Sequence, residues 1–352
     1  MIAQMHLIVL AIAYFTALAS WLGCRNLSKP SSPLYRADQP NHRSMHSRPI
    51  AANGGIAIIL CILLAWSALF LLLPITHTVH WIVIGLIVIA GLSLADDYLD
   101  LSPWLRLGVH VLVAFAALLA GDALPSRRMF GTDIAALEPV LWIASLLAII
   151  WFINLYNFMD GMDGSAGGMG VIGFAVFSVF GWLVGDVLFA AMTMMVAVAC
   201  LGFLLLNFPP ADLFMGDVGA ASLGFLAGVF SLWGASEKIF SWWLPILVFS
   251  PFIVDATLTL LQRALKGERI WEPHKKHYFQ RLIDMGWSHR KTVTSGYFLM
   301  AACGISALVV AYLPEGSGWY MALAWICIYT LLIFCIHFIL RKRSRKRQRS
   351  AG

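Results

Sequence analysis

The sequence predicts an all-α, polytopic integral membrane protein. Of its 352 residues, 60% are hydrophobic and only 12% are charged. The apolar residues form repeated runs of about 20, the length that a helix needs to cross a ~30 Å hydrocarbon core. These runs are continuously apolar rather than alternating, which argues against a β-barrel.

Eleven transmembrane helices are expected from these runs, of which the third and fourth are short for the membrane core. The expected spans are residues 4–24, 51–73, 81–95, 107–121, 139–156, 165–185, 188–206, 218–235, 239–262, 293–313 and 319–340. The first lacks a basic N-terminal region, so we expect an uncleaved span rather than a signal peptide. A single transmembrane catalytic domain is expected over residues 1–340, followed by a basic tail at 341–352.

Positive charge predicts the orientation of the chain. Cytoplasmic loops are enriched in lysine and arginine. With the N-terminus outside, all 24 lysines and arginines lie inside except Arg127, Arg128 and Lys238. We therefore expect a periplasmic N-terminus and a cytoplasmic C-terminus. The cytoplasmic loops that would carry the chemistry are 25–50, 96–106, 157–164, 207–217 and 263–292. The 6 cysteines lack CxxC spacing, so we expect neither disulfides nor zinc sites.

Acidic residues fall in three groups at the cytoplasmic mouths of these spans, where an ionised carboxylate is costly and marks a functional candidate. The first group is Asp96-Asp97, at the end of the third span. Adjacent helical residues point about 100° apart, so we expect the two carboxylates to face different partners. The helix dipole disfavours anions at a C-terminus, so a metal or a cation should compensate them. Pro103 is expected to mark a turn.

The second group lies in the string NLYNFMDGMDG. Two asparagines and two aspartates recur in it at every third position, so a helical turn would bring them to one side. The glycines are expected to break the helix and to open the next span, where backbone N–H groups can approach a phosphate. Close helix packing is the alternative role for the glycines, but it does not explain the polar residues Asn154, Asn157, Asp160 and Asp163.

The third group is Asp217, in the segment NFPPADLFMGDVG. Pro209-Pro210 should end a span and force an extended loop. Asp217 lies between glycines where the next span begins, and helix N-capping is an alternative role for it. Asp255, inside the expected span 239–262 after Pro251, is expected to cap a broken helix segment or to support the site indirectly.

Two basic segments on the same side complete the pattern. The first, in the loop 263–292, could bind a pyrophosphate, because its lysines act as point charges and its arginine as a fork donor. Its two histidines lack a third ligand nearby and are weak evidence for a metal. These residues are His274, Lys275, Lys276, His277 and Arg281.

The other basic segment precedes Asn53-Gly54-Gly55, at the start of the second span, and carries Arg43, His46 and Arg48. For both segments the alternative is a solvated loop that contacts only lipid headgroups.

Acids, cations and glycines at one membrane face suit phosphoryl-group chemistry, in which positioning and charge stabilisation do most of the catalysis. Carboxylate, amide and water oxygens favour magnesium, with manganese as an alternative. A site at the hydrocarbon boundary suits one lipid substrate and one soluble substrate. We expect no nucleic-acid partner, and a homodimer is one open choice of oligomeric state.

The ordered motifs DD, NxxNxxDGxDG and MGDxG resemble those of the polyprenyl-phosphate N-acetylhexosamine-1-phosphate transferases, the MraY-like, WecA-like and WbpL-like membrane enzymes of glycosyltransferase family 4. PNxRSxH…GG and HxxHxxQRL look most like the branch that initiates bacterial O-antigen or capsule repeats. The resemblance covers residues 40–290. It implies transfer of a sugar 1-phosphate from a UDP-sugar to undecaprenyl phosphate, with release of UMP, at the cytoplasmic face of a bacterial inner membrane.

The resemblance also implies roles for individual residues. Asn157 and Asp217 would bind magnesium, and Asp96 and Asp97 would be the catalytic pair near the lipid phosphate. Asp160, as a further catalytic residue, and Asp163 would serve the nucleotide and metal region. The diphosphate would lie at His274 and His277, although the family's contiguous histidines are separated here by Lys275-Lys276.

Two rival functions predict different behaviour. An intramembrane aspartyl protease, suggested by Gly216-Asp217, needs two aspartates within spans and no magnesium. A cation-coupled transporter expects acids near the midplane of the membrane, whereas these acids cluster at one interface.

Overall fold

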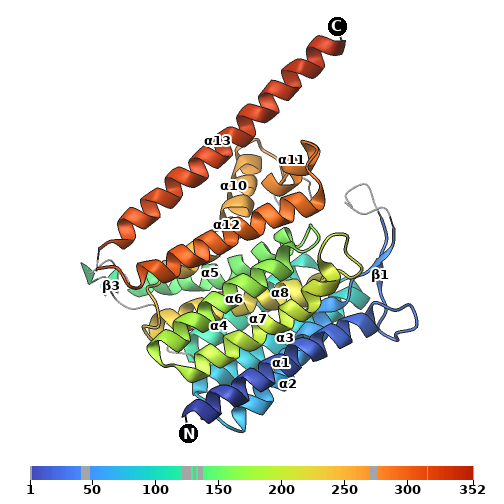
Figure 1. Cartoon of the computed structure of the whole chain (residues 1–352). Helices are drawn as coiled ribbons and strands as arrows, with labels where there is room; N and C mark the ends of the chain where they lie inside the picture. The colour runs from blue at the N-terminus through green and yellow to red at the C-terminus, as the bar shows by residue number, and fades with distance from the viewer. Residues whose placement is uncertain are drawn as a thin grey trace.

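In the computed structural model the chain forms a bundle of long helices, and its described residues include two very short antiparallel strand pairs (Figure 1). The structure describes residues 2–40, 48–120, 128–129, 132–133, 138–269, 276–314 and 316–351. The helices are α1 (Ile2–Leu27), α2 (Gly54–Phe70), α3 (His77–Leu99), α4 (Pro103–Ala120), α5 (Glu138–Met159), α6 (Ser165–Val184), α7 (Val187–Asn207), α8 (Gly216–Ser236), α9 (Leu244–Val248), α10 (Ser250–Leu265), α11 (Tyr278–Asp284), α12 (His289–Val310) and α13 (Gly318–Ala351). Strand β1 (Ala37–Asp38) pairs with β2 (Ile50–Ala51), and β3 (Arg128–Met129) pairs with β4 (Thr132–Asp133).

Among the described residues, 8 helices are long and apolar enough to cross a membrane: α1, α3, α5, α6, α7, α8, α12 and α13. Two shorter apolar helices, α2 and α4, accompany them. Each of these helices overlaps one expected span. The expected third span, 81–95, is too short, because α3 runs 23 residues. The predicted all-α, polytopic membrane protein is therefore confirmed.

The expected span 239–262 is wrong as a single helix. The chain there forms α9 and α10, and Phe249 caps the end of the first and the start of the second. Pro251 lies in the first turn of α10, where a missing backbone N–H costs nothing. Pro103 likewise begins α4 instead of marking a turn, and the turn lies just before it at Asp100, whose φ is 50°.

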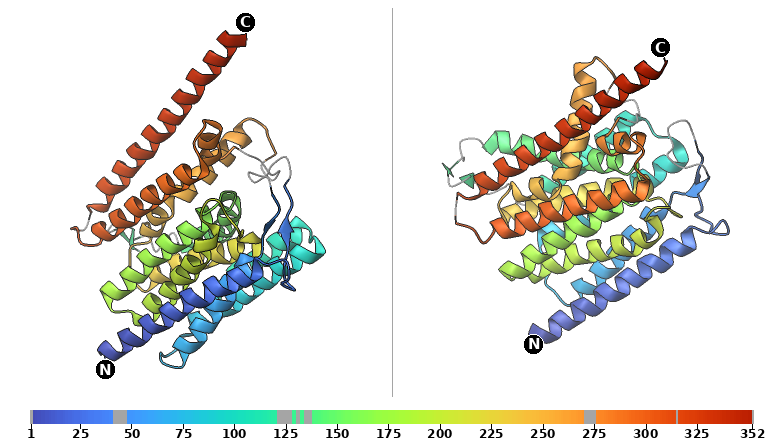
Figure 2. Two further views of the ribbon diagram at one scale, coloured as in Figure 1. Left: turned by 45° about the vertical axis from the view of Figure 1, so that its right-hand side comes forward. Right: turned by 45° about the horizontal axis from the view of Figure 1, so that its top comes forward.

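The last helix differs from the others in length and position. α13 runs 34 residues and continues through the basic tail, which is therefore helical as far as Ala351. It packs mainly against α12. In every view the N-terminus and the C-terminus lie at opposite ends of the bundle (Figures 1 and 2). β1 and α11 lie at the end away from the N-terminus (Figure 1), and we call this the acidic end.

The core of the bundle is built around α8, which packs against α2, α3 and α5. Small residues let the α8 backbone approach its neighbours closely. A Cβ added at Gly224 would lie 2.4 Å from the Phe152 carbonyl oxygen, and one at Gly228 would lie 3.0 Å from the Cα of Ile149. Residue numbers thus increase along α5 in the direction in which they decrease along α8, so the two helices are antiparallel.

Candidate active site

The antiparallel register of α5 and α8 brings two of the acidic groups together at the acidic end. Since Ile149 faces Gly228 and Phe152–Ile153 faces Gly224, the same register places Asp160 opposite Asp217. The charge of Asp217 does act on Asp160. Two motifs that are far apart along the chain therefore meet in space.

The α5–α6 connection holds the second acidic group. α5 ends at Met159, so Asp160 and Asp163 lie in the loop and the expected four-residue helical stack is wrong for both. The break before α6 is confirmed, because Gly164 has the left-handed φ of 76° and caps the next helix. Asn154 donates to the Ile150 carbonyl of its own helix at 2.8 Å.

Asn157 differs from Asn154, one turn earlier on α5, in its hydrogen bonding. Its Oδ1 is buried and has no hydrogen-bond partner among the described residues. A buried acceptor without a donor is costly, and a cation is one group that would satisfy it.

Asp160 is held in an environment that opposes its charge. Burial, the charge of Asp217 and the charge of Asp163, in that order, raise the pKa of Asp160 well above its ordinary value. Carboxylates crowded in this way favour the binding of a divalent cation, which would offset their repulsion.

Asp217 is the second residue of α8 and lies in its first turn. The N-cap is Met215 without a side-chain cap, so the capping interpretation of Asp217 is wrong. The entry to α8 is tightly packed: Gly216 has φ 72°, and a Cβ there would lie 2.3 Å from the Ala52 carbonyl oxygen. Asp217 also lies within electrostatic range of Asp96 and Asp97.

Asp96 and Asp97, in the last turn of α3, face different partners, as the helical geometry predicts. Asp96 Oδ2 accepts from Arg106 Nη1 at 2.5 Å, and its Oδ1 accepts from the Leu101 N–H at 2.8 Å. Asp97 pairs with Arg36. The cations that compensate this C-terminal acid pair are thus two arginines, which the sequence interpretation did not single out. No local motif marks Arg36, because it is distant from Asp97 along the chain.

The residues at this end suit magnesium. Among the described residues, no three His, Cys, Asp or Glu side chains are placed to hold a metal together. Magnesium does not require such a cage, since it usually takes one or two carboxylates and fills its octahedron with water and substrate phosphate. Asp217 and the unpartnered Asn157 Oδ1 offer donors of the right kind.

The HxxHxxQRL segment is anchored chiefly by Asp255. The Asp255 carboxylate accepts from the backbone N–H groups of Tyr278 and Phe279 at 2.8 and 3.1 Å, and its Oδ1 lies 3.1 Å from His277 Nδ1. It therefore caps α11 and not α10. His277 is buried and serves this anchor, and its contact with a diphosphate stays a prediction.

The other described cations of this segment have protein partners. Lys276 Nζ lies 2.6 Å from Glu268, and this hydrogen bond, together with one from Arg263, lowers the pKa of Glu268. Arg281 donates to the Lys276 carbonyl at 2.8 Å and lies over the Tyr278 ring. His274 and Lys275 lie outside the described residues.

Arg48 reaches the loop before α8. Its Nη2 lies 2.8 Å from Asp212 Oδ1, in an exposed pair of the kind that contributes at most about 1 kcal/mol. This contact brings the basic segment that precedes Asn53 beside the segment that carries the third acidic group. Arg43 and His46 lie outside the described residues.

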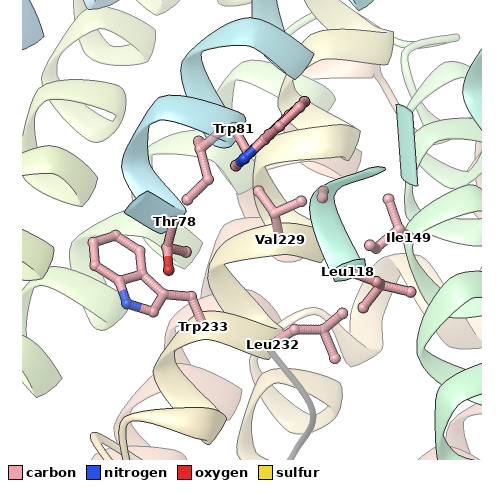
Figure 3. Close-up of a pocket in the computed structure, with 9 residues that line it drawn as sticks. Thr78, Trp81, Leu118, Ile149, Val229, Leu232 and Trp233 are labelled. Atoms are coloured by element: carbon pink, nitrogen blue, oxygen red, sulfur yellow. The ribbon is translucent and has the colours of Figure 1, made fainter. Parts of the chain in front are cut away.

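A small apolar pocket lies away from these groups (Figure 3). Thr78 and Trp81 from the start of α3 line it with Leu232 and Trp233 from the end of α8. Asp97 and Asp217 lie at the other ends of these helices, so this pocket is not the acidic site.

Comparison with known proteins identifies the family of the chain. Residues 79–235, from α3 to α8, match the model of the family described as Glycosyl transferase family 4. A probable undecaprenyl-phosphate N-acetylglucosaminyl 1-phosphate transferase from Bacillus subtilis is 32% identical over 303 residues, which cover 84% of this chain and 82% of that protein. The chain belongs to glycosyl transferase family 4.

The transferase has further relatives with related names. A phospho-N-acetylmuramoyl-pentapeptide-transferase from Rickettsia canadensis is 27% identical over 342 residues, covering 86% of this chain and 91% of that protein. A decaprenyl-phosphate N-acetylglucosaminephosphotransferase from Mycobacterium leprae is 27% identical over 310 residues, covering 79% and 78%. The transferase is thus a multi-pass membrane phosphotransferase, and its three acidic groups lie within the region that the family model matches.

Proposed function

We propose that the transferase moves the sugar 1-phosphate of a UDP-N-acetylhexosamine onto undecaprenyl phosphate and releases UMP. The observation that carries this proposal is the meeting of Asp160, Asp217 and the arginine-paired Asp96 and Asp97 at one end of the bundle. Relatives named for the transfer of an N-acetylhexosamine phosphate to a polyprenyl phosphate support the substrate class.

The finer assignment is to the first step of O-antigen or another cell-envelope polysaccharide, at the cytoplasmic face of the inner membrane. It is supported by the PNxRSxH and HxxHxxQRL motifs and by the positive charge expected on that side. N-acetylglucosamine is the first sugar to test, because two relatives are named for it.

The proposed step is a direct in-line displacement. An oxygen of undecaprenyl phosphate attacks the β-phosphorus of the UDP-sugar. A new P–O bond forms there as the bond from the β-phosphorus to the bridging oxygen breaks. UMP leaves with that oxygen, and undecaprenyl-diphospho-sugar remains.

The acceptor needs little help from a general base, since the second pKa of a phosphate monoester is ~6. The arginine pairing supports this view: Asp96 and Asp97 are already engaged by Arg106 and Arg36. We propose that the two acids orient these guanidinium groups toward the acceptor phosphate, which fork donors bind well. Purified transferase given UDP-sugar alone should then show no stoichiometric burst of UMP, whereas a covalent aspartyl-phosphate route requires one.

Magnesium, or manganese, would be held by Asn157 and Asp217, and when bound it would neutralise charge on the diphosphate. Asp160 would act beside the metal as a further catalytic residue. We propose that the UDP-sugar is bound by Asp163, Lys276, His277, Arg281 and Arg48, together with Arg43, His46, His274 and Lys275.

The test is a screen of UDP-sugars with undecaprenyl phosphate and magnesium, with UMP release as the readout. We expect lipid-linked product and UMP from at least one UDP-N-acetylhexosamine, and loss of both with EDTA. UMP release that survives EDTA would contradict the magnesium site, whereas peptide cleavage or ion transport without UMP would support one of the rival functions instead.

A further inference from the structure

Two loops hold Asp160 and Asp217 in place. The Asp160 loop, residues 160–164, joins α5 to α6, and the Asp217 loop, residues 208–215, joins α7 to α8. Asp160 begins the first loop, and Asp217 is the second residue of the helix that follows the second loop. The separation of the two acids therefore depends on how the two loops are held together.

Asn207, the last residue of α7, joins the two loops through both ends of its amide. Its Oδ1 accepts from the Gly164 N–H at 2.8 Å, and its Nδ2 donates to the Leu213 carbonyl at 2.8 Å. Asn207 is 2% exposed, so water does not compete for these bonds. One buried side chain therefore reaches into each of the two loops.

Further bonds strengthen this connection. Asp163 Oδ2 accepts from the Ala211 N–H at 3.1 Å, which is a second crossing between the loops. Beyond Leu213, the Phe214 N–H donates to the Ala51 carbonyl at 2.7 Å, which fastens the Asp217 loop to β2.

We propose that Asn207 is a positioning residue that sets the separation of the Asp160 loop and the Asp217 loop for the transfer reaction. This inference rests on the proposed function for its chemical consequence, although the connection itself is structural. An amide is required because one position must supply both an acceptor and a donor. Leucine has nearly the same shape and supplies neither.

The test compares full-length Asn207→Leu with the wild type in detergent. Thr193→Val is the matched control: Thr193 is also buried on α7, but it bonds only to carbonyls of its own helix. The dissociation constant of Mn²⁺ is measured by electron paramagnetic resonance without substrate. Hydrogen exchange is followed in the two loops, and kcat and KM are measured for each substrate.

We expect Asn207→Leu to weaken Mn²⁺ binding about 10-fold, the lower end of the range for loss of a supporting partner. Hydrogen exchange should quicken in both loops, and the KM for the UDP-sugar should rise while the KM for undecaprenyl phosphate does not. Thr193→Val should match the wild type. If Asn207→Leu does not fold, Asn207→Ser, which loses reach but leaves room for water, is measured in its place with the same expected directions.

Unchanged Mn²⁺ affinity and unchanged exchange in a folded Asn207 variant would overturn the inference. A change in Mn²⁺ affinity without faster exchange would overturn it as well, because it would make Asn207 a direct ligand. A wild type that transfers no sugar phosphate, while its Asn207 variant still shows both effects, would refute the proposed function and leave the positioning role standing.

Discussion

α8 and the apolar part of α13, Gly318–Leu340, have similar lengths of 21 and 23 residues but opposite surroundings. The most apolar stretch of α8 is 94% buried within the protein, whereas that of α13 is 6% buried. α8 presents small residues such as Gly219, Ala220 and Gly224 to its neighbours, and α13 exposes large ones such as Tyr320 and Phe334.

The difference shows where this fold can hold charged groups in a set geometry. A helix that faces lipid gains little from close packing, since lipid tails are as apolar as its side chains. A helix of small residues packs backbone against backbone, so its first turn is held firmly. Asp217 stands on that turn, and the following changes test whether the contrast between the two helices has this meaning.

The largest effect is expected from Asp217→Asn. Loss of a metal-binding carboxylate removes charge stabilisation worth several kcal/mol, so kcat should fall by about 1,000-fold. Thr330→Val on α13 should leave kcat unchanged, because Thr330 is exposed and bonds only to its own helix. Steady-state UMP release measures both, and an Asp217→Asn variant with near-normal turnover would remove Asp217 from the metal site.

The packing of α8 is tested by two matched glycines. Gly224→Ala places a methyl group 2.4 Å from the Phe152 carbonyl oxygen, whereas Gly91→Ala on α3 meets nothing within 4 Å. We expect Gly224→Ala to lower the free energy of unfolding by about 1–3 kcal/mol, as overpacking does. Gly91→Ala should be neutral or stabilising, since alanine favours helix. Equal shifts in the detergent melting temperature would contradict the difference in packing.

A smaller effect is expected from Asp160→Asn at the acidic end, where the substitution should stabilise the metal-free protein rather than destabilise it. The raised pKa of Asp160 means that its ionised form opposes folding. The metal-free wild type should therefore lose stability as pH rises through that pKa. Asp160→Asn should remove this loss and raise the melting temperature above neutral pH while lowering kcat. Asp284→Asn, at an exposed position on α11, should do neither. A lower melting temperature for Asp160→Asn without metal would show that the carboxylate stabilises the fold.

The smallest effect is expected on α13. Its Tyr329 hydroxyl lies 2.7 Å from Ser250 Oγ on α10. Tyr329→Phe should cost about 0.6 kcal/mol, the average for a hydrogen bond between membrane helices. Tyr320→Phe, at a side chain that is 79% exposed, should cost nothing measurable. A loss at Tyr329 as large as that at Gly224 would mean that α13 contributes to the core after all.

The fold followed from the sequence wherever local pattern decides it. Long apolar runs predicted the spans, and Gly164 predicted the start of α6, because the helix break depends on residues close to it. The break in the expected span 239–262 was anticipated only as one alternative for Asp255, since Pro251 is compatible with a helix start as well as with a kink.

The site followed from the sequence only in part. Asp160 and Asp217 were predicted from their own motifs. Their opposition depends on the register of α5 against α8, and the pairing of Asp97 with Arg36 depends on tertiary contact between distant segments. Asn207 stands in the segment that drew attention to Asp217, but its role depends on the loops that it joins.

The proposed transfer breaks the donor's bond between the β-phosphorus and the bridging oxygen, so the sugar keeps its phosphate. The most direct measurement uses UDP-N-acetylglucosamine labelled in the β-phosphate, with undecaprenyl phosphate, magnesium and the purified transferase. We predict that the label enters the lipid product and that the released nucleotide is unlabelled UMP. Label retained in released UDP would show transfer of the sugar without its phosphate and would contradict this mechanism.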